Sequence, residues 1–111
     1  MSMRLTGRRI EISPQLKDYI DRKMAKLDRY SVHIVDSELI LYYENHFAWA
    51  EGILHLKNDK ITTRVKAKSL RKAVHDLTDK LVRQMERFEG RHRSKIKSRR
   101  TPGPGREETA I

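Results

Sequence analysis

Basic side chains recur at helical spacing near the end of the chain. When this segment is drawn as a helix with Leu77 at the centre of its apolar face, five cations fall within one flank: Lys72, Lys80, Arg83, Arg87 and Arg91. Lysine and arginine in such a row can neutralise successive phosphates and release counterions from a nucleic acid. Arginine can also bind phosphate through two nitrogens or stack on a base. The spacing predicts a phosphate-binding flank; the alternative is a helix face that is merely solvated.

The acidic residues of the same segment are expected to be set apart from this flank. Asp76 interrupts it and could pair with Lys72 or Lys80, whereas Asp79 and Glu86 should point away from most of it. Segregation of the two signs favours the nucleic-acid interpretation over the solvated face.

The distribution of charge along the chain supports the same interpretation. Nine Lys and Arg match nine Asp and Glu in residues 1–59, whereas fifteen oppose four in residues 60–100. The net charge of +10 is therefore concentrated in the last third of the chain. Charge alone predicts a polyanionic partner, and DNA, RNA and anionic lipid all remain compatible with it.

Composition and length limit the class of protein. A chain of 111 residues is expected to form one domain, and the absence of cysteine excludes disulfides, thiolate metal sites and a cysteine nucleophile. Residues 1–12 contain no signal-peptide pattern, and no apolar run approaches the roughly 20 residues of a membrane span. We expect a soluble cytoplasmic protein with no membrane partner.

Five histidines could suggest metal or acid–base chemistry, but their spacing does not support it. No two of them lie three to five residues apart on a predicted helix, and no carboxylate pattern completes a ligand set. Phosphate loops, nucleophile elbows and zinc-protease helices are also missing from the sequence. The sequence therefore predicts no enzyme, metal, cofactor or small-molecule substrate. The histidines are His33, His46, His55, His75 and His92.

The elements that must position the basic flank follow from the apolar pattern. Ser13-Pro14 and Ser69 are expected to begin helices over 14–30 and from residue 70 to about 88, where Gly90 ends or loosens the second one. Two-residue alternation predicts strands over 3–12, 32–44, 47–57 and 61–68, with a bulge at Gly7 and a slip at Gly52. The order β-α-β-β-β-α predicts an α+β fold in which both helices pack on one face of a four-stranded sheet.

Aromatic residues bracket the predicted turn between the second and third strands: Tyr42, Tyr43, Phe47 and Trp49. If exposed, they could stack on bases as single-stranded RNA binders do. Strand alternation instead favours packing of one member of each adjacent pair against the helices. We adopt core packing as the expectation.

Three segments, in order, resemble the ribosome hibernation promoting factor family: residues 10–14 (IEISP), 23–30 (KMAKLDRY) and 79–85 (DKLVRQM). The resemblance spans about residues 3–93. It implies the fold inferred above, which is similar to double-stranded RNA-binding domains. Accordingly we expect a ribosome-binding domain over 1–93, and composition predicts a disordered basic, then Pro/Gly-rich, tail over 94–111. The chain resembles the short members of the family, which lack the extra C-terminal dimerisation domain of the long form.

The resemblance implies that the protein binds the small ribosomal subunit and its ribosomal RNA. It would occupy the messenger and transfer RNA channel, block translation reversibly and maintain hibernating ribosomes under stress or in stationary phase. In the family, basic residues of both helices face RNA; the matching ones here are Arg22, Lys26, Arg29, Lys80, Arg83 and Arg87. A regulatory protein-interaction module, such as a transcription-factor modulator, and a general RNA-binding protein remain the alternatives.

One departure from the family lies at the start of the second helix. Where the family often has Asp-Met-Tyr, this chain has Ser69-Leu70-Arg71, and the surroundings are more basic than usual. Ser69 can still cap the helix and Leu70 can still pack, but any contact made by the tyrosine ring is lost. The predicted RNA-binding set therefore also includes Lys66, Lys68, Arg71, Lys72 and Arg91.

Overall fold

Four strands and two helices follow one another in the order predicted from the sequence. The computed structural model describes the backbone of residues 2–100 and the side chains of residues 3–91. The strands are β1 (Ser2–Gly7), β2 (Ile34–Glu44), β3 (Phe47–Leu56) and β4 (Lys60–Ala67); the helices are α1 (Pro14–Met24), the 3₁₀ helix η1 (Ala25–Tyr30) and α2 (Leu70–Arg100).

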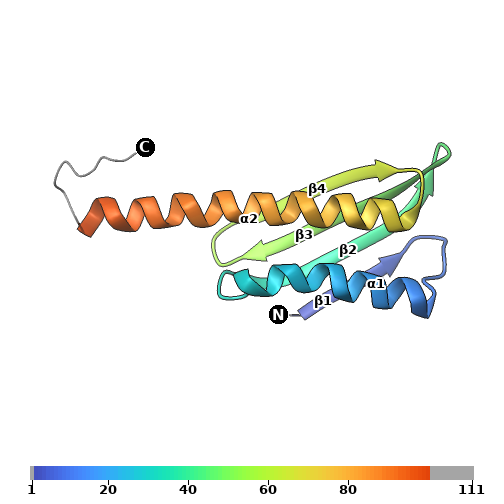
Figure 1. The fold of residues 1–111 in the computed structure, drawn as a ribbon, viewed down its shortest axis with the longest axis horizontal. Helices are drawn as coiled ribbons and strands as arrows, with labels where there is room; N and C mark the ends of the chain where they lie inside the picture. Colours follow the sequence, from blue (N-terminus) through green and yellow to red (C-terminus); the bar gives the residue numbers. More distant parts are fainter. Residues whose placement is uncertain (1, 101–111) are drawn as a thin grey trace.

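The strands form one mixed sheet in the order β1-β2-β3-β4. β1 runs parallel to β2, so the chain crosses between them through α1 and η1, whereas β2, β3 and β4 are joined as antiparallel hairpins. The two helices lie side by side on one face and leave the other face open (Figure 1). This arrangement confirms the predicted α+β fold and makes β1 and β4 the edge strands.

The inner face of β3 carries small residues where α2 crosses it. Ala48, Ala50 and Gly52 alternate there, and both alanines are fully buried. A Cβ atom added at Gly52 would lie 3.0 Å from Cδ1 of Leu81 and 3.1 Å from Cδ2 of Leu77, so the helix packs directly on the strand backbone. The predicted slip at Gly52 is wrong, because β3 pairs with both neighbours without a bulge at this residue.

The aromatic residues near the β2–β3 turn lie away from the helices or at the end of the sheet. Tyr42 and Trp49 are cross-strand partners on the open face, with rings parallel to within 2° and centroids 6.2 Å apart. Tyr43 and Phe47 are exposed. The expected packing of these rings against the helices is therefore wrong, because small residues of β3 and leucines of β2 take the inner positions.

β1 is shorter than the predicted strand over residues 3–12. It ends at Gly7, where an added Cβ would lie 2.9 Å from the carbonyl oxygen of Ile10, since the chain folds back over this residue. Arg9 makes the turn with a φ of 58°, in the left-handed region. Ile10 and Ile12 still pack against the core, but from a loop.

Both predicted helix caps are confirmed. The Ser13 hydroxyl accepts a hydrogen bond from the backbone N–H of Leu16, and the Ser69 hydroxyl accepts one from Lys72. The first helix is not α-helical throughout residues 14–30, because η1 continues it with three residues per turn. That geometry keeps Leu27 and the buried Tyr30 on one face.

α2 does not end at Gly90, which was predicted to end or loosen it. A Cβ atom added at Gly90 would have no heavy atom within 4 Å, and the helix runs on to Arg100 past the end of the sheet (Figure 1). The tail expected from residue 94 therefore begins as helical backbone. Residues 101–111 lie outside the described residues, and the division of the chain at residue 93 stays a prediction.

Candidate nucleic-acid interface

Cations without acidic partners line the flank of α2 that borders β4. Lys80, Arg83, Arg87 and Arg91 are all exposed. Among the side chains that the structure describes, none of these four forms an ion pair with a carboxylate. We call these four residues the α2 flank. Their positive charges are available to a polyanion.

The start of the predicted row is different, because Lys72 already has a partner. Its ammonium group lies 3.1 Å from the carboxylate of Asp76, one turn later, which confirms the pairing expected from the sequence. An exposed pair of this kind is weak, about 0.3–0.5 kcal/mol, so a phosphate could replace Asp76.

Asp79 lies beside the α2 flank, not away from it, which corrects the prediction. Its carboxylate is 3.3 Å from Nε2 of His75, and its backbone oxygen accepts a weak hydrogen bond from Nε of Arg83 at 3.4 Å. Asp79 and Asp76 also line the same cleft as Lys80. Each of these two carboxylates therefore has a neighbour on α2 other than Lys80 or Arg83.

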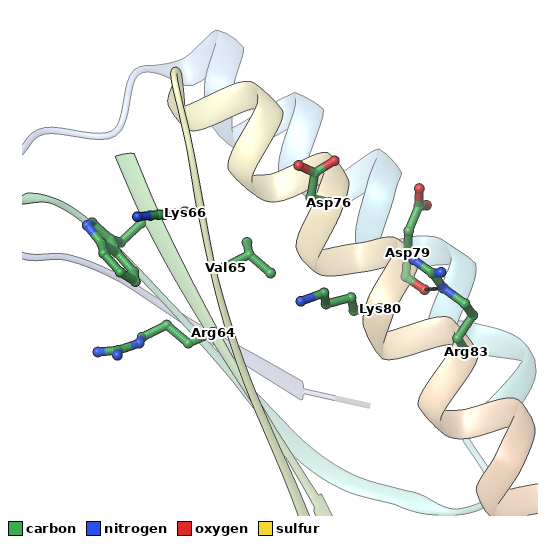
Figure 2. Close-up of a pocket in the computed structure, with 8 residues that line it drawn as sticks. Arg64, Val65, Lys66, Asp76, Asp79, Lys80 and Arg83 are labelled. Atoms are coloured by element: carbon green, nitrogen blue, oxygen red, sulfur yellow. Dashed lines mark hydrogen bonds between the residues drawn. The ribbon is translucent and has the colours of Figure 1, made fainter. Parts of the chain in front are cut away.

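A cleft of about 450 Å³ connects the α2 flank to the edge of the sheet. Figure 2 shows Arg64 and Lys66 on one side of β4 and Lys80 reaching from α2 toward the other side. The hydroxyl of Thr63 donates a hydrogen bond of 2.6 Å to Gln84 and ties β4 to α2 beside the cleft. The predicted residue Lys66 thus lines the same cleft as Lys80 and Arg83, from the opposite side of β4.

A second group of predicted residues meets at the other side of α2. The guanidinium of Arg71 lies 4.6 Å from the ring centroid of Tyr19, and that of Arg22 lies 6.0 Å from the same ring. Tyr19 thus holds one arginine from each helix at the start of the α1–α2 pair. This contact occupies the site where the chain departs from its family.

Lys23 connects the two helices further along. Its ammonium group lies 2.8 Å from Nδ1 of His75. Burial lowers the pKa of Lys23 from its ordinary value, and the neighbouring Lys26 lowers it further through a hydrogen bond and repulsion, while Asp79 opposes the change. The predicted residue Lys26 is thus part of a crowded basic group between the helices.

The remaining predicted residues are not brought into the cleft. Arg29 lies over the ring of Tyr30, 5.3 Å from its centroid, at the end of η1. Lys68 is exposed between β4 and α2. The eleven predicted basic residues therefore form no continuous patch: the α2 flank with Lys66 is one surface, and the α1–α2 pair is another.

The open face of the sheet is also rich in cations, but acids accompany them. Arg4 of β1 lies between Asp36 and Glu38 of β2 and forms an ion pair with each. Glu38 is also 3.1 Å from Nε2 of His55 on β3. This part of the sheet is a mixed network of both charges.

Glu51 is the centre of the other half of the open face. Its carboxylate is 3.9 Å from both Arg8 and Arg64, and it accepts a hydrogen bond of 3.0 Å from the hydroxyl of Tyr42. Burial, followed by this hydrogen bond, raises the pKa of Tyr42 above its ordinary value. Arg8 also covers the ring of Tyr42, and Arg64 covers Trp49 at 4.7 Å.

Sequence reasoning did not include Arg64 and Trp49 among the site residues. The two-residue alternation of β4 already put Arg64 on the same face as Lys66, so that signal was present. The position of Trp49 required knowing that α2 lies against the small residues of β3, which no local pattern reveals.

Neither a membrane span nor a metal site is found among the described residues. No helix among them is long and apolar enough to cross a membrane. Within the same part of the chain, no three His, Cys, Asp or Glu side chains gather in a way that could hold a metal ion.

Comparison with known proteins decides the family. The family model described as sigma 54 modulation protein / S30EA ribosomal protein matches residues 3–93. The chain belongs to this family. A ribosome hibernation promoting factor of Klebsiella oxytoca is 28% identical over 97 residues, which cover 87% of this chain and 98% of that protein. The resemblance predicted from the three sequence segments is thereby confirmed.

A longer relative matches over part of its length. The ribosome hibernation promotion factor of Bacillus subtilis is 27% identical over 105 residues, which cover 92% of this chain but 56% of that protein. The chain thus spans little more than half of this relative.

Two solved structures share the fold of this chain. The N-terminal domain of Protein Y from Thermus thermophilus superposes with a TM-score of 0.71 at 29% identity, covering 79% of this chain and 99% of that domain. A ribosomal subunit interface protein from Coxiella burnetii superposes with a TM-score of 0.76 at 20% identity, covering 81% of this chain and 99% of that one. The second comparison bears on the fold alone.

Proposed function

We propose that this protein binds the small ribosomal subunit in the cytoplasm and inhibits translation, keeping ribosomes in an inactive, hibernating state. It occupies the channel where messenger and transfer RNA otherwise bind, and the α2 flank contacts ribosomal RNA. The role is one of binding, without catalysis. The ribosome hibernation promoting factors that match most of this chain support the choice of partner.

The single observation that carries the proposal is the state of the cations on α2. Lys80, Arg83, Arg87 and Arg91 project from one helix and have no carboxylate partner among the described side chains. The same helix is fixed to the sheet by buried residues that include Leu77 and Leu81. A rigid row of this kind can follow a phosphate backbone, and no free energy is lost in first breaking ion pairs within the protein.

Co-sedimentation with vacant small subunits tests the flank. The double substitution Arg83→Glu with Arg87→Glu should weaken binding roughly hundredfold or more, because two attractive contacts become repulsive. Lys17→Glu with Lys57→Glu is the matched control, since both lysines are exposed, lie outside the predicted set and give the same change in net charge. Circular dichroism and thermal unfolding establish that both variants are folded. Equal binding by the two folded variants would remove the α2 flank from the mechanism.

Competition tests the proposed position on the subunit. Subunits already loaded with messenger and transfer RNA should exclude the protein, since the three would share one channel. Stable co-sedimentation on loaded subunits, with both RNAs retained, would contradict occupancy of the channel. Failure to bind vacant and loaded subunits alike would favour the alternative of a protein-interaction module.

A further inference from the structure

The cleft beside β4 combines the two kinds of group that recognise a nucleotide. Trp49 supplies an aromatic ring, which lies with Arg64 and Lys66 on the open-face side of β4. Lys80 and Arg83 line the same cleft from α2, on the other side of that strand (Figure 2). Aromatic rings stack on unpaired bases, and neighbouring cations bind the phosphates that join them. The volume of about 450 Å³ is shared between the sheet edge and α2, so one ligand can touch both.

The ring of Trp49 is held in place from one side. Its cross-strand partner Tyr42 lies parallel to it, and the hydroxyl of Tyr42 is fixed by a hydrogen bond to Glu51. The indole is therefore oriented before any ligand arrives. It is also only half-buried, so it can be reached from the cleft.

A displaceable group covers the indole. Arg64 lies 4.7 Å from the Trp49 centroid, but its side chain is 56% exposed and its distance to Glu51 is 3.9 Å. Lys66 lies further from the same ring, at 5.8 Å. An exposed cation–π contact is weaker than a base stack, so a base can take the place of Arg64 while the freed guanidinium turns to a phosphate or to the base.

The two acids that line the cleft each have a neighbour other than Lys80 and Arg83. Asp76 forms an ion pair with Lys72 at 3.1 Å, and the carboxylate of Asp79 lies 3.3 Å from Nε2 of His75. Among the described side chains, Lys80 and Arg83 have no such ion pair. Lys80 and Arg83 are thus available to an anion on the α2 side of the cleft.

We propose that this cleft binds a short stretch of unpaired RNA, with one base stacked on Trp49 on the open-face side of β4 and a neighbouring phosphate held by Lys80 and Arg83 on the α2 side. The inference rests on the proposed function, because the same cations belong to the α2 flank. It adds that the protein distinguishes an unpaired nucleotide from a duplex, which phosphate contacts alone do not do.

Trp49 is the one tryptophan in the sequence, so its fluorescence reports on the cleft without a label. Short single-stranded oligouridine RNA should quench it in a saturable manner. An abasic oligonucleotide of equal length and a fully paired duplex should bind, as shown by the anisotropy of an end label, with little quenching. Quenching by the abasic strand equal to that by oligouridine would overturn the proposal.

Substitution of the ring gives a second readout. Trp49→Leu should weaken binding of oligouridine roughly tenfold and leave duplex binding unchanged, whereas Trp49→Phe should restore most of the loss, because the ring remains. Thermal unfolding checks that both variants are folded. Equal affinity of the wild type and a folded Trp49→Leu variant for oligouridine would overturn the proposal.

Two further measurements distinguish RNA from a free nucleotide as the ligand, and failure of the nucleotide site from failure of the proposed function. Free uridine monophosphate should quench far more weakly than oligouridine at equal concentration; equal quenching would overturn the assignment to RNA. Normal subunit binding without base-dependent quenching would contradict the proposed nucleotide site but not the proposed function. Base-dependent quenching in a protein that does not bind subunits would support the cleft and sink the proposed function.

Discussion

The α2 flank and the open face of the sheet both carry several cations, but they differ in how those cations are neutralised. On the open face, Arg4 is paired with two acids of β2, and Arg8 and Arg64 share Glu51. On the α2 flank, Lys80, Arg83, Arg87 and Arg91 have no ion pair among the described side chains. The number of basic residues on a surface is thus a poor guide to its affinity for a polyanion, and their pairing is a better one.

The same contrast explains the position of the cleft. It lies at the edge strand β4, where the paired network of the open face ends and the unpaired row begins. Arg64 belongs to both surfaces, since it contacts Glu51 on one side and lines the cleft on the other. The boundary between the surfaces is therefore the place where a base and a phosphate can be bound together.

The largest effect on stability is expected at Gly52, where α2 packs directly on β3. Gly52→Val would drive new methyl groups into Leu77 and Leu81, so we expect the free energy of unfolding to fall by about 1–3 kcal/mol. The strand preference of valine offsets at most about 1 kcal/mol. Urea denaturation measures the change.

A second glycine of the same chain is the control. The neighbourhood of Gly90 is open, so Gly90→Ala should raise the free energy of unfolding by up to about 1 kcal/mol through helix propensity. If Gly52→Val were as stable as the wild type, the close packing of α2 on β3 would be wrong.

A smaller effect is expected from the titration of Tyr42 within the paired network. Burial and the hydrogen bond to Glu51 raise its pKa in the folded state, so the stability that depends on its neutral form is fully present below pH about 10. That stability is lost as the pH rises through the folded-state pKa. Absorbance near 295 nm should therefore show a tyrosine that ionises later than a free one.

Tyr42→Phe should remove this late component and leave the other three tyrosines. The variant should also lose less stability than the wild type between pH 10 and the folded-state pKa. If Tyr42→Phe instead removed a component that titrates near pH 10, Glu51 would not hold the hydroxyl.

Local patterns were sufficient to predict the order of the elements and the course of the basic flank. Ser13 and Ser69 cap the helices as expected, and the apolar spacing around Leu77 oriented the cations toward solvent. These features depend on neighbours within about one helical turn, which a sequence displays directly.

The errors share a different origin, which is contact between distant segments. Aromatic residues near the β2–β3 turn were expected to pack against the helices. α2 approaches β3 so closely at Gly52 that only small side chains fit there, and Trp49 lies on the open face. Likewise, Asp79 is positioned beside the cleft partly by His75, whose ring is met by Lys23 of α1. Such contacts are properties of the packed layers and have no signature in a single segment.

The most direct test of the account compares the two surfaces with equal changes of net charge. Lys80→Gln with Arg87→Gln removes two of the four cations of the α2 flank, and Arg4→Gln with Arg8→Gln removes two cations of the open face. The measurement is the slope of log binding constant against log salt concentration for small subunits. We predict that the double substitution on the α2 flank makes this negative slope shallower by roughly 0.7–0.9 for each cation removed. The double substitution on the open face should leave the slope unchanged. An equal reduction by the open-face pair would contradict the claim that unpaired cations on α2 form the interface.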